Sequence, residues 1–397
     1  MMFSVGHRAV SGVLLLLLLL LVPVQSRGQK WVGTWSSAPY AAGTNTPPAP
    51  YLENNTLRQV VRVSIGGDTL RVKFSNITSA TPVTLKAVTL AALMQKGQSA
   101  IDAASLVKIY FNGEEQVTME PFSEVTSDPV AFGLTPGMQL AITTWYGECK
   151  TAPDMTHHYG SRTDSYILSG NHSETASFAG SVPIERWYHL CSVEVRASPS
   201  SAAIAVLGNS ITDGYGLHGG LMNKWTDIFS ERLLSDPATS HIAVLNLGIG
   251  ATWLITSGVK RFRKDILEQN GVGWVVVFYG VNDIGGGASA EKIIEAFTTL
   301  IAQAHEARLP VFGATITPFK GHGYYSPQHE AVRQEVNHWI RTPGNFDGCI
   351  DFDKVLRDPS DSTRLRAEYS NDWLHPNTEG YKALGEAVDL KFFTTRD

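Results

Sequence analysis

From about residue 200 onward, five apolar runs alternate with segments of helical periodicity. The runs include "AAIAVLG", "HIAVLNLGI" and "GWVVVFYGV", and each is followed by an amphipathic stretch such as "AEKIIEAFTTLIAQAHEA". Continuous apolar strands joined by helices are typical of a parallel sheet that is covered on both faces. We therefore expect residues 200–397 to form a flavodoxin-like, doubly wound α/β domain with five parallel strands. Its site should lie beyond the carboxyl ends of those strands.

The preceding segment, residues 29–199, has a different pattern. Short runs such as "LRQVVRVSI" and "TLRVKFSNI" alternate apolar and polar residues, and Gly, Pro, Asn and Asp separate the runs. This pattern predicts an all-β sandwich or jelly roll. The turn at residues 66–68, "GGD", predicts a hairpin between the two runs quoted. Such a domain either serves only for packing or also contacts carbohydrate, and the sequence leaves both roles open.

The N-terminus has the organisation of a secretory signal peptide. His7 and Arg8 precede the apolar segment "VLLLLLLLLV", and small residues follow it near residue 26. The apolar segment is shorter than the roughly 20 residues that span a bilayer. We expect residues 1–28 to be a signal peptide, the protein to be secreted or periplasmic, and no stable membrane anchor to be present. An uncleaved anchor is the alternative.

Charge and cysteine content exclude several classes of partner. The net charge of −5 gives no basic footprint for nucleic acid. Export permits a disulfide, and Cys149 with Cys191 is the favoured pair because both lie in the same half of the chain, which leaves Cys349 free. The chain contains no C-x-x-C motif, and no carboxylate stands at ligand spacing from His157 and His158. We therefore expect neither metal nor cofactor, and a surface or interface role for these histidines.

Polar residues stand where the predicted strands end. Ser210 follows the first strand, Asn282 follows the third, and Asp372 and His375 precede the last helix. A serine hydroxyl becomes a nucleophile when a histidine takes its proton and a carboxylate fixes the tautomer of that histidine. Serine before a helix is more commonly an N-cap. Ser210 alone does not distinguish a helix cap from a nucleophile, whereas the four residues together favour a catalytic site.

These segments resemble the SGNH (GDSL) hydrolase superfamily. "GNSITDG", "NLGIGA", "GVND" and "DWLHP" resemble its sequence blocks, and the resemblance covers residues 203–390. It implies that Ser210 is the nucleophile, His375 the general base and Asp372 its orienting partner. It also implies an oxyanion hole formed by the N–H groups of Ser210 and Ala251 and by the Asn282 amide. The segment that begins "WVGTWSSAP" resembles the β-rich domain that precedes the catalytic domain in secreted bacterial members.

The sequence departs from the pattern of this superfamily at two positions. Asn209 replaces the usual aspartate before the serine, and Ala251 replaces the usual glycine of the second block. Alanine still donates its N–H, but a positive φ at this position would strain it by about 1 kcal/mol. Trp253 and Trp373 lie beside the blocks and are candidates for lining a substrate pocket, although core packing is the alternative for both.

The expected function follows from the resemblance together with the predicted export. We expect a secreted serine esterase without cofactor that hydrolyses carboxylic esters, with O-acetyl or other short acyl groups on carbohydrate as the favoured substrates. A GDSL lipase or arylesterase acting on lipid or aryl esters is one alternative. A catalytically decayed glycan-binding protein, in which Asn209 and Ala251 mark the decay, is another.

Overall fold

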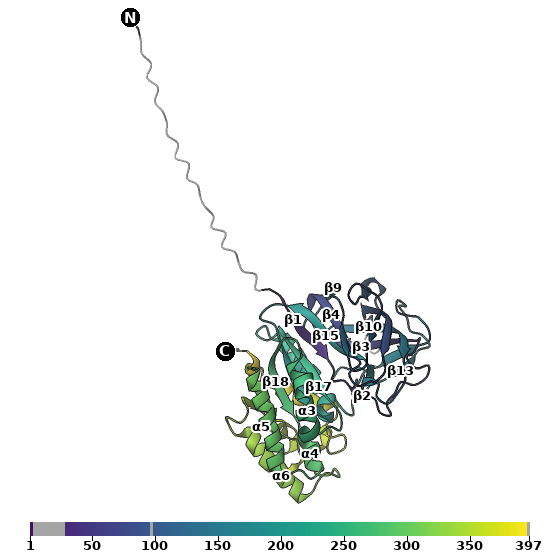
Figure 1. The fold of residues 1–397 in the computed structure, drawn as a ribbon. Coiled ribbons are helices and arrows are strands. Elements are labelled where there is room, and N and C mark those ends of the chain that lie inside the picture. The colour runs from purple at the N-terminus through teal and green to yellow at the C-terminus, as the bar shows by residue number, and fades with distance from the viewer. Residues whose placement is uncertain (3–27, 96–97, 395–397) are drawn as a thin grey trace.

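The computed structural model of the protein describes residues 1–2, 28–95 and 98–394 (Figure 1). The segment expected to be a signal peptide falls largely on residues 3–27, which lie outside the described residues. Within the described ranges, no helix has both the length and the apolar character needed to cross a membrane.

The C-terminal half contains the predicted parallel sheet. Its five strands lie in the order β17–β16–β18–β19–β20, and every neighbouring pair is parallel. The interior strand β16, which lies between β17 and β18, is buried along its whole length, and this explains why its sequence is continuously apolar. The predicted α/β fold is therefore confirmed. In chain order the strands are β16 (Ala202–Gly208), β17 (Ile242–Gly248), β18 (Val272–Phe278), β19 (Val311–Ala314) and β20 (Gly348–Ile350).

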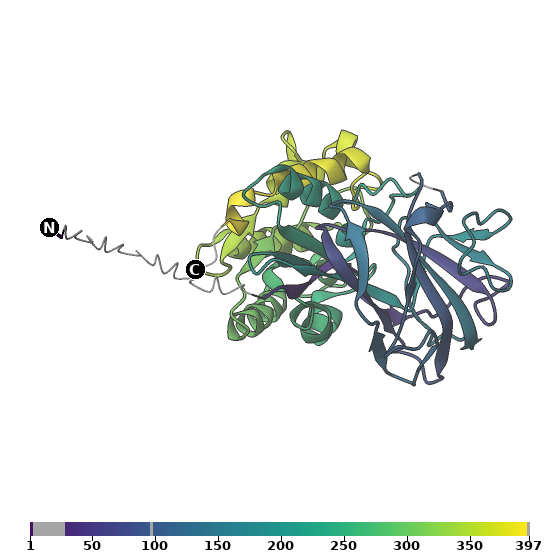
Figure 2. The ribbon, with the colours of Figure 1, turned by 90° about the horizontal axis from the view of Figure 1, so that it is seen from above.

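Helices cover both faces of this sheet (Figure 2). α2 and α8 contact each other on one face, and α5 and α6 contact each other on the other. The helical segments are α1 (Ser210–Asp213), α2 (Trp225–Ser235), η2 (Leu254–Gly258), α3 (Val259–Phe262), η3 (Arg263–Leu267), α4 (Val281–Gly285), α5 (Ala290–Glu306), α6 (Pro327–Arg341), α7 (Phe352–Leu356), η4 (Ala367–Tyr369), α8 (Thr378–Ala387) and η5 (Leu390–Phe393). A short hairpin, β21 (Arg357–Asp358) with β22 (Asp361–Leu365), precedes η4.

The N-terminal half is all-β, as predicted, and its strand pairs are antiparallel. One sheet contains β1 (Lys30–Ser36), β15 (Leu190–Ala197), β4 (Gly67–Ser75), β8 (Glu124–Thr126) and β9 (Val130–Leu134). A second contains β13 (Val182–Ile184), β12 (Ser165–Leu168), β3 (Thr56–Arg62), β10 (Gln139–Cys149), β5 (Val83–Ala92), β6 (Val107–Ile109) and β7 (Val117–Met119). A third, small sheet contains β14 (Trp187–Tyr188), β11 (Thr156–His158) and β2 (Tyr40–Ala41). The one helical turn in the described part of this half is η1 (Ala103–Ser105).

The predicted hairpin at residues 66–68 is wrong. β3 and β4 belong to different sheets, so the chain crosses from one sheet to the other at this point. The two glycines allow close packing there. A Cβ on Gly66 would lie 2.2 Å from the Leu134 carbonyl oxygen, and a Cβ on Gly67 would lie 2.5 Å from the Val195 side chain. A glycine pair between two alternating runs signals a hairpin only where those runs pair with each other.

The favoured disulfide between Cys149 and Cys191 is also absent, and all three cysteines of the chain are free thiols. Cys149 ends β10 in one sheet, whereas Cys191 lies on β15 in the other sheet, where its thiol donates to the Lys73 carbonyl. Both thiols are buried, and burial raises the pKa of each well above its usual value. Location in the same half of the chain does not bring two side chains into contact.

Buried polar side chains fix the carboxyl edge of the parallel sheet. Arg261 donates to the Gly208 carbonyl oxygen at 2.9 Å and to the Leu247 carbonyl oxygen at 2.7 Å, which joins the ends of β16 and β17. Asn246 on β17 donates to the Thr212 carbonyl in α1. Helix α1 packs directly on Gly248, because a Cβ there would lie 2.6 Å from a backbone nitrogen of α1. The edge therefore holds α1 rigidly, and α1 begins with Ser210.

Candidate active site

Ser210 is the first residue of α1, and its side chain does not cap the helix. The N-cap is Asn209, whose side-chain oxygen accepts from the Ile211 N–H at 3.2 Å. The Ser210 hydroxyl instead lies 2.9 Å from Nε2 of His375. An asparagine oxygen caps a helix as well as an aspartate oxygen does. Asn209 therefore keeps the capping function at the position where the superfamily carries an acid.

His375 stands between Ser210 and Asp372. Its Nδ1 is 2.8 Å from Asp372 Oδ2, and Asp372 Oδ1 accepts from the backbone N–H groups of His375 and Leu374 at 2.7 and 3.0 Å. Burial would raise the pKa of Asp372, but the hydrogen bonds from His375 outweigh it and lower that pKa. Burial lowers the pKa of His375 below its usual 6.5, although Asp372 opposes this shift. The structure thus brings the three predicted side chains into one hydrogen-bonded series, and the lowered pKa favours the neutral form of His375.

Three N–H donors face the same space beside Ser210. Within the described residues, no acceptor takes the backbone N–H of Ser210 or of Ala251. The Asn282 side chain donates one hydrogen to the Thr252 carbonyl at 2.9 Å, which leaves its second hydrogen for the pocket that Asn282 lines. Unpaired, fixed donors are what the oxyanion of an acyl-transfer intermediate requires. The roles of these groups in catalysis remain predictions.

Ala251 has the positive φ that would strain an alanine at this position. Its φ is +58°, in the left-handed region that glycine adopts without cost. The neighbouring segment holds this conformation, because the Asp283 carboxylate accepts from the N–H groups of Leu254 and Ile255 at the start of η2. The alanine therefore costs stability, but it does not remove the N–H donor.

We expect Ala251→Gly to raise the free energy of unfolding by about 0.5–1 kcal/mol, since it removes the clash of Cβ at positive φ. Activity should remain within about threefold of wild type, because glycine donates the same N–H. Urea denaturation measures the first quantity and ester turnover the second. Ala288→Gly, in a loop where φ is not positive, is the matched control and should destabilise. A lower stability for Ala251→Gly would contradict the strain.

A pocket of about 450 Å³ opens onto these residues. That volume is within the range of small-molecule sites. Its walls are formed by Tyr40, Asn45, Tyr159, Arg162, Ser210, Asp213, Tyr215, Gly250, Ala251, Asn282, His322, Tyr324, Leu374 and His375. Tyr215 lies against His375, with the two ring centroids 4.2 Å apart. The pocket is therefore rich in aromatic and hydrogen-bonding groups and has little aliphatic surface.

The two predicted pocket tryptophans are not among these wall residues. Trp253 packs on Gly286, where a Cβ would lie 2.0 Å from its ring, and it remains 39% exposed. Trp373 packs on Gly321, where a Cβ would lie 2.7 Å from its ring. Trp253 is close in sequence to the wall residue Ala251, and Trp373 directly precedes the wall residue Leu374. Contact of either one with substrate remains a prediction.

The wall opposite the parallel sheet comes from the β-rich half, which sequence reasoning did not foresee. The loop between β11 and β12, residues 159–164, contributes Tyr159 and Arg162. Asp213, three residues after Ser210, holds this loop. Its carboxylate oxygens lie 2.9 Å from Nε2 of His158 and 3.3 Å from Nη2 of Arg162. The loop can approach this closely because residue 160 is a glycine. A Cβ at this position would lie 1.9 Å from the Asp213 carboxylate.

Asp213 is therefore an ionised residue that joins the two halves of the chain. Burial alone would raise its pKa, but His158 and Arg162 outweigh burial and lower the pKa to about 2. His157 and His158 are both buried, and each Nδ1 contacts a backbone carbonyl oxygen near β2. The predicted interface role thus describes His158, whereas His157 packs on Tyr40 and Tyr188 inside the β-rich half. The acidic residue within "NSITDG" was the signal that could have identified this contact.

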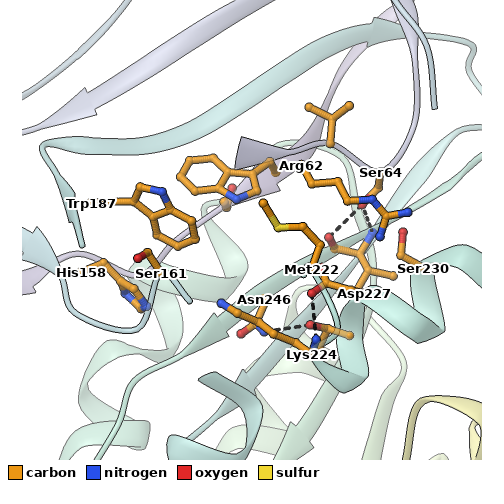
Figure 3. Close-up of a pocket in the computed structure, with 15 residues that line it drawn as sticks. Arg62, Ser64, His158, Ser161, Trp187, Met222, Lys224, Asp227, Ser230 and Asn246 are labelled. Carbon is orange, nitrogen blue, oxygen red and sulfur yellow. Dashed lines mark hydrogen bonds between the residues drawn. The ribbon is translucent and has the colours of Figure 1, made fainter. Parts of the chain in front are cut away.

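A second, smaller cavity lies behind the 159–164 loop, between the two halves of the chain (Figure 3). Side chains from both halves line it, including His158 and Trp187 from the β-rich half and Lys224 and Asp227 from the other. Lys224 is buried, donates to the Gly160 carbonyl at 3.0 Å and lies 5.3 Å from the Trp187 ring. Burial lowers the pKa of Lys224. With about 40 Å³ of space the cavity accommodates a few waters and no substrate. The contact of Lys224 with Gly160 helps to hold the 159–164 loop in place.

This protein has a parallel sheet covered by helices, with a serine–histidine pair at the carboxyl edge of the sheet. That combination is typical of α/β serine hydrolases. Residues 206–383 match the GDSL-like lipase/acylhydrolase family. This part of the chain is therefore a GDSL-like lipase/acylhydrolase domain, and the protein is a carboxylic ester hydrolase. Comparison with curated proteins found no match.

Several solved structures resemble about half of this chain. A member of the lipolytic protein G-D-S-L family from Veillonella parvula is 18% identical, with 49% of this chain and 99% of that chain covered and a TM-score of 0.38. A GDSL-like lipase from Bacteroides thetaiotaomicron is 17% identical over 48% and 87% of the two chains, with a TM-score of 0.37. A catalytic mutant of the acetylxylan esterase Axe2 from Geobacillus stearothermophilus is 18% identical over 47% and 92%, with a TM-score of 0.40.

Proposed function

We propose that this protein is an exported serine esterase that removes acetyl or other short acyl groups from carbohydrate. The observation that carries the proposal is the series of contacts from the Ser210 hydroxyl through His375 to Asp372, at 2.9 and 2.8 Å. A hydroxyl hydrogen-bonded to a neutral, carboxylate-oriented imidazole is the arrangement that makes serine nucleophilic.

In the proposed reaction, His375 Nε2 takes the Ser210 proton while Oγ attacks the ester carbonyl carbon. The carbonyl oxygen becomes an oxyanion, which the N–H groups of Ser210 and Ala251 and the Asn282 amide stabilise. The imidazolium then gives its proton to the alcohol oxygen, the C–O bond breaks and an acyl-enzyme remains. Water repeats the two steps, releases the carboxylic acid and restores Ser210. Asp372 stabilises the imidazolium and stays ionised throughout.

The composition of the pocket wall supports a short acyl group and an oxygen-rich alcohol. Leu374 is the single wall residue with an aliphatic side chain longer than a methyl group. A long acyl chain packs best against aliphatic surface, at roughly 25 cal/mol for each Å² covered, whereas four of the wall residues here are tyrosines. Tyrosine rings and hydrogen-bonding side chains suit a sugar, which presents hydroxyl groups and C–H faces. A lipase acting on long chains is the less favoured alternative.

Export and domain organisation complete the proposal. The charged and apolar pattern of residues 1–28 supports a signal peptide and hence a secreted or periplasmic protein. Residues 29–199 and 200–397 are proposed as a β-rich domain and a catalytic domain. Because Tyr40 and Arg162 stand in the pocket wall, we assign the β-rich domain a part in substrate binding as well as in packing.

We expect kcat/KM to fall at acid pH with a midpoint below 6.5. Catalysis requires neutral His375, and burial lowers the pKa of this group. Activity is therefore full above the lowered pKa and falls about tenfold for each pH unit below it. A pH–rate profile with a soluble acetyl ester measures this midpoint. A flat acid limb, or a midpoint above 7, would contradict His375 as the base.

The proposal is tested by ester hydrolysis across acyl lengths, with acetyl, butyryl, octanoyl and palmitoyl esters of p-nitrophenol and with acetylated xylan. Ser210→Ala serves as the blank for every substrate. Serine-dependent release that is strongest for acetyl and butyryl esters, and that includes the polysaccharide, supports the proposal. A preference for palmitoyl esters would replace it with a lipase. No serine-dependent release from any of these esters would overturn it.

A further inference from the structure

Arg162 is the one arginine in the wall of the active-site pocket. It comes from the 159–164 loop of the β-rich half and is only 7% exposed. Its backbone φ is +55°, a strained conformation for a residue with a side chain. The Gly220 N–H donates to its carbonyl oxygen at 3.1 Å and holds it there. Such strain persists where the surrounding structure fixes a residue, often at a functional site.

The guanidinium of Arg162 has more donors than partners. Arginine carries five N–H donors, yet among the described residues its single hydrogen bond runs from Nη2 to Asp213, at a long 3.3 Å. Its Nε is buried and has no hydrogen-bond partner in the described part of the chain. Buried donors in folded proteins are almost always paired. A hydrogen-bond acceptor that enters the pocket would therefore pair with the free N–H groups of Arg162.

Neighbouring rings place Arg162 on the alcohol side of the ester. The guanidinium lies 5.7 Å from the Tyr215 ring centroid, and that ring lies 4.2 Å from the imidazole of His375. In acyl transfer the base returns its proton to the leaving alcohol, so groups next to the base contact the alcohol portion. The oxyanion donors contact the carbonyl oxygen instead.

We propose that Arg162 is a substrate-specificity residue, whose free N–H groups bind neutral oxygen atoms of the alcohol portion. The inference rests on the proposed esterase function and narrows its substrate to esters of polyhydroxylated alcohols. Neutral acceptors fit better than a carboxylate, because the Asp213 carboxylate in contact with Arg162 already balances its charge. The β-rich half thereby contributes to substrate choice in a reaction carried out by the other half.

The test compares two acetyl esters that differ in the alcohol. Phenyl acetate has a hydrocarbon alcohol without further acceptors, whereas an acetylated xylo-oligosaccharide has many. Removing the N–H donors in Arg162→Met should lower kcat/KM for the sugar ester at least tenfold more than for phenyl acetate, mainly through KM. Arg196→Met is the matched control. Arg196 also belongs to the β-rich half and lies over an aromatic ring, that of Trp31 at 5.5 Å, but does not line the pocket, so the ratio of the two rates should stay that of wild type.

The other outcomes overturn the inference. Equal losses on both esters, with a lower Tm, would make Arg162 a structural partner of Asp213. No loss on either ester would leave it without a role in binding. Turnover of phenyl acetate by wild type without turnover of the acetylated sugar would reject the substrate class, while Ser210-dependent hydrolysis still stood. Absence of any Ser210-dependent turnover would instead reject the proposed function itself, and the two failures are therefore distinguishable.

Discussion

Replacement of Ser210 by alanine is expected to lower kcat for acetyl esters by on the order of 10⁴–10⁶-fold. The variant loses the atom that forms the acyl-enzyme, while His375 and Asp372 keep their own hydrogen bond. The fold should be unaffected because Asn209, and not Ser210, caps α1. We expect the free energy of unfolding to change by less than about 0.5 kcal/mol. Steady-state hydrolysis and urea denaturation on the same preparation measure both quantities.

Asn209→Ala is the matched control for this prediction. It removes the side-chain oxygen that accepts from the Ile211 N–H, so it should cost about 1 kcal/mol of stability. Its Ser210 hydroxyl remains, and its kcat should therefore stay far above that of Ser210→Ala. If Ser210→Ala kept more than about a tenth of wild-type kcat, Ser210 would not be the nucleophile. If it lost stability instead, the capping role would have to be reconsidered.

The sequence was informative where local pattern and topology coincide. Each parallel strand is buried on both faces, so its apolar run is readable without knowledge of its neighbours, as for β16. Parallel strands also share one carboxyl edge, so Ser210 and Asn282 could be placed together before any contact was known. Asp372 and His375 are three residues apart, a spacing within which a carboxylate reaches an imidazole.

The errors and omissions concern contacts between distant segments. The pairing partners of β3 and β4 depend on strands more than 60 residues away, such as β10 and β15, and the "GGD" turn carries no information about them. The pocket wall formed by the 159–164 loop depends on an ion pair between Arg162 and Asp213, 51 residues apart. Arg162 has no local pattern that distinguishes it from a surface charge, and Asp213 stands out only by its place three residues after Ser210. The need for glycine at residue 160 is visible only in the structure, where a Cβ would collide with the Asp213 carboxylate.

The substitution Asp372→Asn is expected to lower kcat by about 10⁴-fold, as in other Ser-His-Asp enzymes. The Asn oxygen can still accept from the backbone N–H groups of Leu374 and His375, so the loop should persist. The side-chain amide then faces His375 Nδ1 and donates to it. This fixes the tautomer with hydrogen on Nε2, which can no longer take the Ser210 proton. Asp372 also raises the pKa of His375, so its loss should move the acid midpoint of the residual activity further down.

Measurement of kcat and of the pH midpoint together separates this positioning role from a purely structural one, because loosening the loop would not lower the midpoint. Asp389→Asn is the matched control. Asp389 likewise accepts from the N–H two residues ahead, at 3.0 Å, but lies outside the pocket wall. Its kcat should stay within about twofold of wild type. A loss of less than tenfold in Asp372→Asn would show that burial and Ser210 alone orient His375, and the carboxylate would then have no catalytic part.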